Sequence, residues 1–284
     1  MVTIATLPKP FIGHIGIIQR NAILSWLHLQ PRPDVILLGD EKGTAEIAAE
    51  LNIKHLPSVE CNTLGTPFLS SAFRMIEEHA KADLICYSNC DIMLFSGHMK
   101  AFSLIRERFA KFLIVGECIN LDVRTPVNFQ DATWQSLLFS DAKERGKRRG
   151  SNADFFLFPR GAFPEFLPLT LGRPFFDNWI LYEARRLHLP VIDITPVAKA
   201  IHQNHFYSAV AGETTATHKG VEAHESLRLL GGWNHVYWIS DATHRLTSAG
   251  LRRNIAGTLL ITQRVLALKR FLGKLKARLL RVIR

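Results

Sequence analysis

Residues 82–95, ADLICYSNCDIMLF, decide the fold predicted for this chain. Residues 84–87 (LICY) form an apolar run without alternation, which is typical of a strand covered on both faces in a parallel sheet. Polar residues 88–91 (SNCD) follow at once, at the strand end where open α/β sheets bind ligands. The Asp91 carboxylate and the Asn89 amide offer oxygen ligands that suit Mg²⁺ or Mn²⁺ holding a diphosphate. The alternative is that both side chains only shape a turn after a core strand.

Strands and helices are expected to alternate along the chain on both sides of this segment. Apolar runs predict strands at residues 2–6, 34–39, 53–56, 112–116, 154–158 and 191–194. Helical spacing predicts helices at 15–29, 44–51, 68–80, 98–109, 131–141 and 180–187. A basic loop is expected at 142–150, an extended segment at 198–205 and irregular structure at 207–245. This order predicts an α/β fold with a mostly parallel sheet and helices on both faces.

The composition is that of an intracellular globular protein. The chain has 284 residues, and 47% of them are hydrophobic, which is enough for one large α/β domain or two small ones. Four cysteines without metal-finger spacing favour a reducing, cytoplasmic setting. Neither a signal peptide at the first residues nor a run of about 20 apolar residues is expected from the sequence.

The net charge of +10 belongs to the C-terminal segment. Residues 251–284 contain ten Lys or Arg and no acidic residue, so the rest of the chain has 25 basic and 25 acidic residues. We therefore predict two parts, a body at residues 1–250 and a basic tail at 251–284. The neutral body argues against nucleic acid as a partner.

Residues 264–284 predict a basic amphipathic helix. Its apolar arc on a helical wheel comprises Val265, Leu268, Phe271, Leu272, Leu275, Leu279, Val282 and Ile283. Such a helix is typical of proteins that lie on an anionic membrane surface, here the inner face of the membrane. The alternatives are a helix packed on the body with its basic side in water, and a helix that binds a partner or nucleic acid.

Three segments resemble nucleotide-diphospho-sugar transferases of the GT-A fold, and among them family 2-like glycosyltransferases most of all. They are the Rossmann-like half at residues 2–91, SNCDIML in the place of an Asp-x-Asp motif, and GRPFFDNWILYEAR at 172–185. The last segment is similar to the one that carries the catalytic carboxylate in this fold. The likeness covers about residues 1–205, and its order implies a GT-A domain followed by the amphipathic helix.

The resemblance implies a donor site at the strand ends, with Asp91 as a metal ligand and a histidine from the segment after the last core strand. Residues three apart in an extended segment point to opposite faces, so only one of His202 and His205 is expected there, and we favour His202. A hydrogen-bonded structural histidine is the alternative. Residues implied at the base, ribose or donor sugar are Leu7, Pro8, Asp40, Ser71, Asn89, Cys90 and Asp154. Asp154 has the alternative role of capping a turn.

Two positions depart from the family pattern. Asn89 stands where the Asp-x-Asp motif has its first acid, and Phe176 stands where a Glu-Asp pair has its Glu. Asp177 is then the remaining base that takes the proton of an acceptor hydroxyl, which implies inversion at the sugar. If Asp177 only orients the acceptor, retention is the alternative, and its structural role would be an N-cap.

The resemblance implies an enzyme that moves a sugar from a UDP-sugar or GDP-sugar donor to the hydroxyl of a glycan or lipid-linked acceptor, with Mn²⁺ or Mg²⁺ bound. Two other functions stay open on the sequence. One is an inactive nucleotide- or glycan-binding protein of the same fold, which the missing acid at position 89 supports. The other is a nucleotidyltransferase, although no glycine-rich loop with Lys or Arg follows the first strand.

Overall fold

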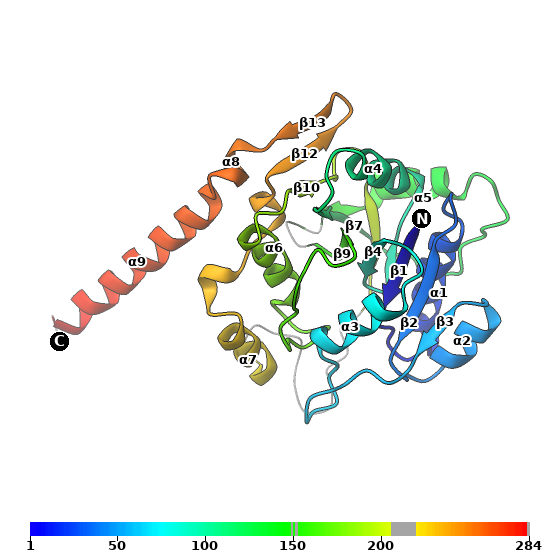
Figure 1. Cartoon of the computed structure of the whole chain (residues 1–284), viewed down its shortest axis with the longest axis horizontal. Coiled ribbons are helices and arrows are strands. Elements are labelled where there is room, and N and C mark those ends of the chain that lie inside the picture. The colour runs from blue at the N-terminus through cyan, green and yellow to red at the C-terminus, as the bar shows by residue number, and fades with distance from the viewer. Residues whose placement is uncertain (149, 151–152, 206–219, 283–284) are drawn as a thin grey trace.

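A nine-stranded sheet runs through the body of the protein (Figure 1). The computed structural model describes residues 1–148, 150, 153–205 and 220–282, with side chains of the last helix described as far as residue 272 except at 262. The strands lie in the order β13-β12-β10-β6-β9-β4-β1-β2-β3. Their bounds in chain order are β1 Val2–Thr6, β2 Asp34–Leu38, β3 Lys54–Leu56, β4 Leu84–Ser88, β6 Leu113–Val115, β9 Phe155–Pro159, β10 Val191–Asp193, β12 His244–Thr247 and β13 Gly250–Arg253.

The sheet is mostly parallel, as the sequence predicts. β4 pairs in parallel with β1, and β1 with β2, so their carboxyl ends meet at one edge. β9 is antiparallel to both β4 and β6, and β13 is antiparallel to β12. The predicted central position of β4 is confirmed, because β4 lies between β1 and β9 with all five residues buried.

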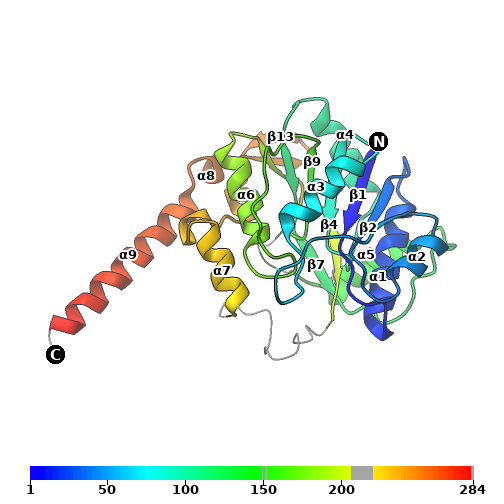
Figure 2. The same cartoon turned by 60° about the horizontal axis from the view of Figure 1, so that its bottom comes forward.

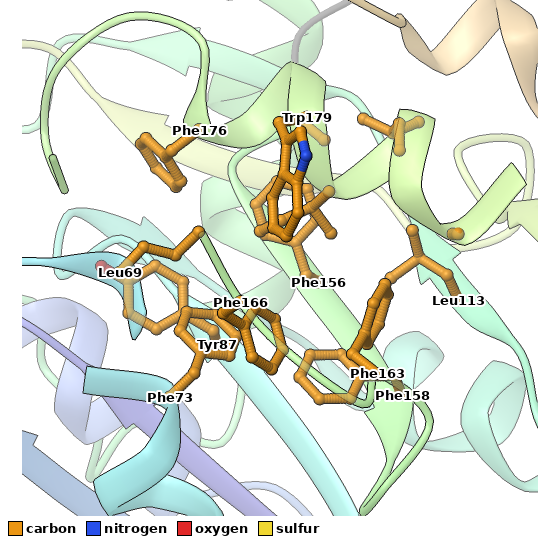
Figure 3. Packing of buried hydrophobic residues seen from close by; sticks show 14 of the residues in the cluster. Leu69, Phe73, Tyr87, Leu113, Phe156, Phe158, Phe163, Phe166, Phe176 and Trp179 are labelled. Atoms are coloured by element: carbon orange, nitrogen blue, oxygen red, sulfur yellow. The ribbon is translucent and has the colours of Figure 1, made fainter. Parts of the chain in front are cut away.

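Helices cover both faces of the sheet, which confirms the predicted architecture. Leu84 and Cys86 of β4 face α1 (Gly13–Leu27), α2 (Thr44–Glu50) and α4 (Ser96–Arg106). Ile85 and Tyr87 face α3 (Leu69–His79), α6 (Phe176–Arg186) and α7 (Val221–Leu229). Figure 3 shows the aromatic packing of this second face, where Phe73 of α3 lies against Tyr87 with ring centroids 5.1 Å apart. The burial of successive residues on opposite faces explains the apolar run without alternation.

A second, four-stranded sheet lies beside the first and was not predicted. Its order is β5-β11-β7-β8, with β5 Ile92–Met93, β7 Cys118–Leu121, β8 Lys147–Arg148 and β11 Ala200–Gln203. α5 (Trp134–Arg145) packs on it through Trp134, Leu138 and Ala142. β5 follows β4 after a short turn and pairs antiparallel with β11, so residues near 91 and 202 become neighbours.

Two expectations about loops are wrong. Residues 142–145 of the predicted basic loop continue α5, because Arg145 pairs with Asp141 one turn earlier, and 147–148 form β8. Residues 220–245 are not irregular: they form α7, the 3₁₀ turns Trp233–His235 and Ile239–Asp241, and the start of β12. Ala223 of α7 is buried in the core on one face of the sheet, and Leu246 of β12 is buried in the core on the other face. This burial fixes the two elements against the body. Residues 206–219 lie outside the described residues.

The tail forms the short helix α8 (Ile255–Thr258) and the long helix α9 (Ile261–Val282). Figures 1 and 2 show α9 extending away from the body. The Gln263 amide anchors its first turn by donating to Val236 O at 2.9 Å and to Asp241 Oδ2 at 2.8 Å. β13 spans the predicted boundary at residue 250 and belongs to the sheet. Among the described helices, none has the length and apolarity needed to span a bilayer.

We expect His98 to make the body sensitive to acid. This histidine is fully buried in α4, and burial lowers its pKa to about 4. The unfolded chain has a histidine pKa of about 6.5, so the folded state gains stability from neutral His98 above that value and loses it as pH falls toward 4. The loss amounts to about 3 kcal/mol. Urea unfolding of the parent and His98→Asn at pH 7 and pH 4.5 measures it; equal pH dependence in both would contradict the assignment.

Candidate metal and nucleotide site

Asp91 lies at the point where the two sheets meet. β4 ends at Ser88, a turn is closed by the Ile92 N–H donating to Asn89 O at 3.1 Å, and β5 begins at Ile92. His202 is the register partner of Ile92 across the β5–β11 pair, and the Gln203 N–H donates to Asp91 O at 3.1 Å. The side chain of Asp91 is thereby held beside the end of β11.

Asp91, His202 and His205 form a cluster with the composition of a metal site. His205 Nε2 lies 2.8 Å from Asp91 Oδ2, and His202 Nε2 lies 3.5 Å from the same oxygen. One ligand atom from each of the three residues fits within 4.8 Å of the others. The expectation that only one of the two histidines would point to Asp91 is wrong, because His205 lies beyond Gln203, where β11 ends, and the alternation of side chains holds only within a strand.

The three side chains are shielded from solvent. Only 4% of the His202 side chain, 2% of the His205 side chain and 16% of the Asp91 side chain are exposed. Burial raises the pKa of Asp91, but its contacts with His202 and His205 outweigh burial and hold the pKa well below the usual range. These contacts favour the ionised form of Asp91, which is the form that could bind a metal ion.

Unsatisfied atoms at the cluster fit a bound cation. Within the described residues, Asp91 Oδ1 and both ring nitrogens of His202 are buried without a hydrogen-bond partner. A buried polar atom without a partner is costly, and a metal ion is one of the groups that removes this cost. One carboxylate with two imidazoles suits Mn²⁺ or another transition metal better than Mg²⁺, which prefers oxygen ligands.

Two buried side-chain amides, those of Asn21 and Gln203, support the backbone around the cluster. The Gln203 amide donates to Ile18 O at 2.7 Å and to Asp91 O at 3.3 Å. The Asn21 amide donates to Gln203 Oε1 at 3.0 Å, and its oxygen accepts from the Val127 N–H at 2.9 Å. These bonds join α1, the β4–β5 turn and β11 around Asp91 and His202. Neither amide is recognisable from the sequence, since residues 182 positions apart carry no local signal of their contact.

A small cavity opens beside Asp91, between the end of β1 and the start of α1. Its lining residues are Leu7, Lys9, Ile15, Ile18, Gln19, Cys90, Asp91 and His205. Gln19 shapes the β1–α1 loop, because it accepts from the Lys9 N–H at 2.6 Å and donates to Lys9 O at 2.8 Å. Leu7 and Cys90, both predicted from the sequence to contact the donor, are thus brought together with the metal cluster. Lys9, which also lines the cavity, was not predicted from the sequence.

The other residues implied for the base and ribose are arranged differently. Pro8 is buried in the β1–α1 loop, and Asp40 is exposed just after β2. Ser71 is buried in α3, where its hydroxyl accepts from the Glu60 N–H at 3.0 Å. None of these three is among the described residues that line the cavity, so their contacts with a nucleotide remain predictions. Tryptophan rings can stack on sugars; Trp179 is buried in the core, whereas Trp233 is 45% exposed.

The loop before α3 is fixed by a carboxylate that sequence analysis also missed. Glu222 of α7 accepts from the Asn62 amide at 2.7 Å and pairs with Arg173, which precedes α6. Burial raises the pKa of Glu222, but bonds from Thr66, Arg173 and Asn62 outweigh it and lower the pKa. The network joins residues 62–66 to the segment that leads to Asp177.

Asn89 and Asp154 form a pair at the antiparallel junction of β4 and β9. The Asn89 amide donates to Asp154 Oδ1 at 3.2 Å, and the Asn89 N–H donates to Asp154 O at 3.1 Å. Asp154 is only 4% exposed. An acid at position 89, as in an Asp-x-Asp motif, would face this carboxylate at close range. The neutral amide of Asn89 is therefore suited to its contact with the Asp154 carboxylate.

We expect Asn89→Asp to destabilise the protein rather than to strengthen metal binding. It would exchange a hydrogen bond between Asn89 and Asp154 for the repulsion of two shielded carboxylates, at a cost of about 1–3 kcal/mol at neutral pH. Urea unfolding at pH 7 measures the loss, and Asn89→Ser is the control that removes the bond without adding charge. An Asp variant that is as stable as the parent and binds Mn²⁺ more tightly would contradict this.

Asp177 lies in the first turn of α6 and is partly exposed. It is not the N-cap, because the structure places Phe175 at that position. Phe175 has a φ of 87°, a left-handed conformation that is unusual for an aromatic residue, and its buried ring meets Trp233 at 5.3 Å. Strained backbone of this kind concentrates at functional sites. The ring of the next residue, Phe176, lies 6.5 Å from Tyr87, so the start of α6 is close to the carboxyl end of β4.

Comparison with known proteins shows the fold. No family model and no curated protein matches the chain. Among solved structures, GalNAc-T7 with UDP, GalNAc and Mn²⁺ is 13% identical over 82% of this chain and 48% of its own, with a TM-score of 0.53. TarS of S. aureus is 14% identical over 81% of this chain and 40% of its own, with a TM-score of 0.43. A protein described as a nucleotide-diphospho-sugar transferase from Desulfovibrio desulfuricans G20 is 10% identical over 81% and 94%, with a TM-score of 0.44.

The fold of this chain is the GT-A fold of nucleotide-diphospho-sugar transferases, as the resemblance implied. The chain spans less than half the length of the GalNAc-T7 and TarS structures that it matches. At these identities the likeness concerns the arrangement of elements only.

Proposed function

We propose that this protein is a metal-dependent glycosyltransferase that moves a sugar from a nucleoside-diphosphate donor to an acceptor hydroxyl. The observation that carries the proposal is the cluster of Asp91, His202 and His205 at the carboxyl end of β4. In open α/β sheets this edge is where ligands bind. An anion with two imidazoles at that edge, in a GT-A fold, is suited to the diphosphate end of a nucleotide-sugar.

Asp91, His202 and His205 would hold Mn²⁺, with Mg²⁺ as the less suited ion. The metal, when bound, offsets the charge that develops on the departing nucleoside diphosphate. Support for Mn²⁺ also comes from GalNAc-T7, whose structure contains UDP and Mn²⁺.

Asp177 is the proposed base. Its carboxylate lies at the start of α6, which the contact of Phe176 with Tyr87 places near the end of β4. A carboxylate across the sugar from the leaving group takes the proton from the acceptor hydroxyl as the hydroxyl attacks the anomeric carbon. The anomeric configuration is then inverted. The glycosidic bond forms as the bond to the diphosphate breaks, and the Asp177 carboxylate accepts the proton of the hydroxyl.

The donor site would extend from the metal cluster along the β1–α1 loop. Leu7, Cys90 and Asp91 line one cavity there, and Asn89 with Asp154 lies on the neighbouring strand ends. We propose UDP or GDP as the nucleotide and a glycan or lipid-linked hydroxyl as the acceptor. The alternative is an inactive binding protein of the same fold, which the Asn at position 89 favours.

A thermal-shift measurement with UDP and GDP, each with Mn²⁺ and with EDTA, tests the proposal. A ligand that binds only the folded state stabilises it and so raises the melting temperature. At a ligand concentration of one hundred times Kd, the free energy of unfolding rises by about 2.7 kcal/mol. We expect one nucleotide to shift the melting temperature only when Mn²⁺ is present. No shift with either nucleotide would contradict a nucleotide-sugar site. A shift without turnover of any donor sugar would favour the inactive binding protein.

A further inference from the structure

Exposed apolar side chains are concentrated on α8 and on the first half of α9. Of the sixteen large apolar side chains that the described residues leave exposed, seven lie between 255 and 272. We call this set the α8–α9 patch: Ile255, Leu259, Ile261, Val265, Leu268, Phe271 and Leu272, with exposures of 46% to 71%. This density is unlike the rest of the surface, and an apolar patch of this kind marks a binding surface.

The patch on α9 forms a continuous row. Ile261, Val265, Leu268 and Leu272 follow each other at spacings of four, three and four residues, which places them on one side of the helix. The body holds the helix elsewhere on its circumference, through the buried amide of Gln263. Arg270 adds a bond to Asn234 Oδ1 at 2.9 Å. The apolar row is therefore not the side by which α9 is attached, and Figures 1 and 2 show the helix projecting from the body.

The charge around the row indicates what covers it. Residues 251–284 contain ten basic side chains and no acidic one. Arg252, Arg253, Arg264 and Lys269 are among those exposed in the described part. If two copies of α9 paired through their apolar rows, Arg264 and Lys269 beside the row would meet the same cations of the other copy, without a carboxylate on either helix to offset them. A second copy is thus a poor occupant, and an anionic surface is a good one.

We propose that α8 and α9 bind an anionic lipid surface, with the apolar row inserted among the headgroups and the basic side chains at the phosphate level. An amphipathic helix with this distribution lies in the interface plane, and it combines apolar burial with electrostatic attraction. The proposal does not depend on the glycosyltransferase function, since its evidence comes only from α8, α9 and their charges. It gives the body a fixed attachment, because Gln263 joins α9 to the 3₁₀ turn at Ile239–Asp241.

Vesicle co-sedimentation of the full chain tests this proposal. The probes are vesicles of equal parts phosphatidylserine and phosphatidylcholine, and vesicles of phosphatidylcholine alone. The variant is Leu268→Ser with Leu272→Ser, at side chains that are 57% and 51% exposed. Its matched control is Leu137→Ser with Leu104→Ser, at side chains that are 58% and 48% exposed on α5 and α4.

We expect the parent and the control variant to bind the anionic vesicles equally well, and the α9 variant to bind them at least about tenfold more weakly. Neutral vesicles should retain little of any of the three proteins, and added salt should release the parent from the anionic vesicles. Equal binding of the α9 variant and the control variant would overturn the proposal. So would a parent that sediments as a dimer in solution when the α9 variant sediments as a monomer, since a second copy would then cover the row. Melting temperatures of both variants verify that they are folded.

Discussion

Replacing Asp91 with Asn is expected to abolish metal-dependent nucleotide binding while the protein remains folded. The substitution removes the only carboxylate of the cluster formed with His202 and His205, but it keeps the shape of the side chain. Loss of a residue that merely supports a ligand weakens metal affinity 10- to 100-fold, so loss of the charged ligand itself should exceed about 100-fold. Calorimetric titration with Mn²⁺, followed by UDP or GDP, measures both affinities.

Asp83→Asn is the control for this substitution, because Asp83 is a carboxylate with an 82% exposed side chain that lies outside the cluster. It should bind metal and nucleotide as the parent does. If Asp91→Asn bound Mn²⁺ and nucleotide with the affinity of the parent, Asp91 would have no place in the site.

Replacing Asp177 with Asn is expected to leave donor binding within about twofold and to reduce turnover by about 10²–10⁴, the usual contribution of a general base. The reason is that Asp177 lies on α6, whereas the proposed metal ligands lie elsewhere. Asp91 follows β4, His202 is in β11 and His205 follows β11. The amide of Asn cannot accept the hydroxyl proton. Titration calorimetry gives the donor affinity, and the rate of nucleotide release with an acceptor gives the turnover.

Glu46→Gln is the matched control for a carboxylate in the first turn of a helix. Glu46 occupies that position in α2, where a negative charge also favours the N-terminal end of the helix. Both variants should lose a similar small amount of stability, but only Asp177→Asn should lose turnover. Transfer at the parent rate by Asp177→Asn would show that another group takes the proton.

The core of the fold was predictable because it depends on local signals. Apolar runs at residues 2–6 and 84–87 predict β1 and β4 almost to the residue, and helical spacing predicts α3 and α6 within a few residues. The short strands β5, β7 and β8 were not predictable in this way. Each has only two to four residues and is a strand because of its pairing partner. β5 and β7 pair with β11, which is distant in sequence, and β8 pairs with β7.

The site was predictable in part for the same reason. Asp91 is recognisable because it follows a buried strand, and His202 follows from the resemblance. The joint approach of His202 and His205 depends on where β11 ends, which the alternation rule for extended chains does not specify. Asn21, Gln203 and Glu222 carry no pattern along the chain, since each acts on residues that only the folded sheet brings near.

Asn21 and Gln203 connect α1, the β4–β5 turn and β11 through side-chain hydrogen bonds. The side chains that would receive the ion are therefore ordered when the chain folds, and binding loses little free energy to conformational entropy. A substitution such as Gln203→Leu should weaken the affinity for Mn²⁺ while every ligand is still present. On this proposal, metal affinity would depend on how α1 is joined to β11 as well as on the ligands themselves.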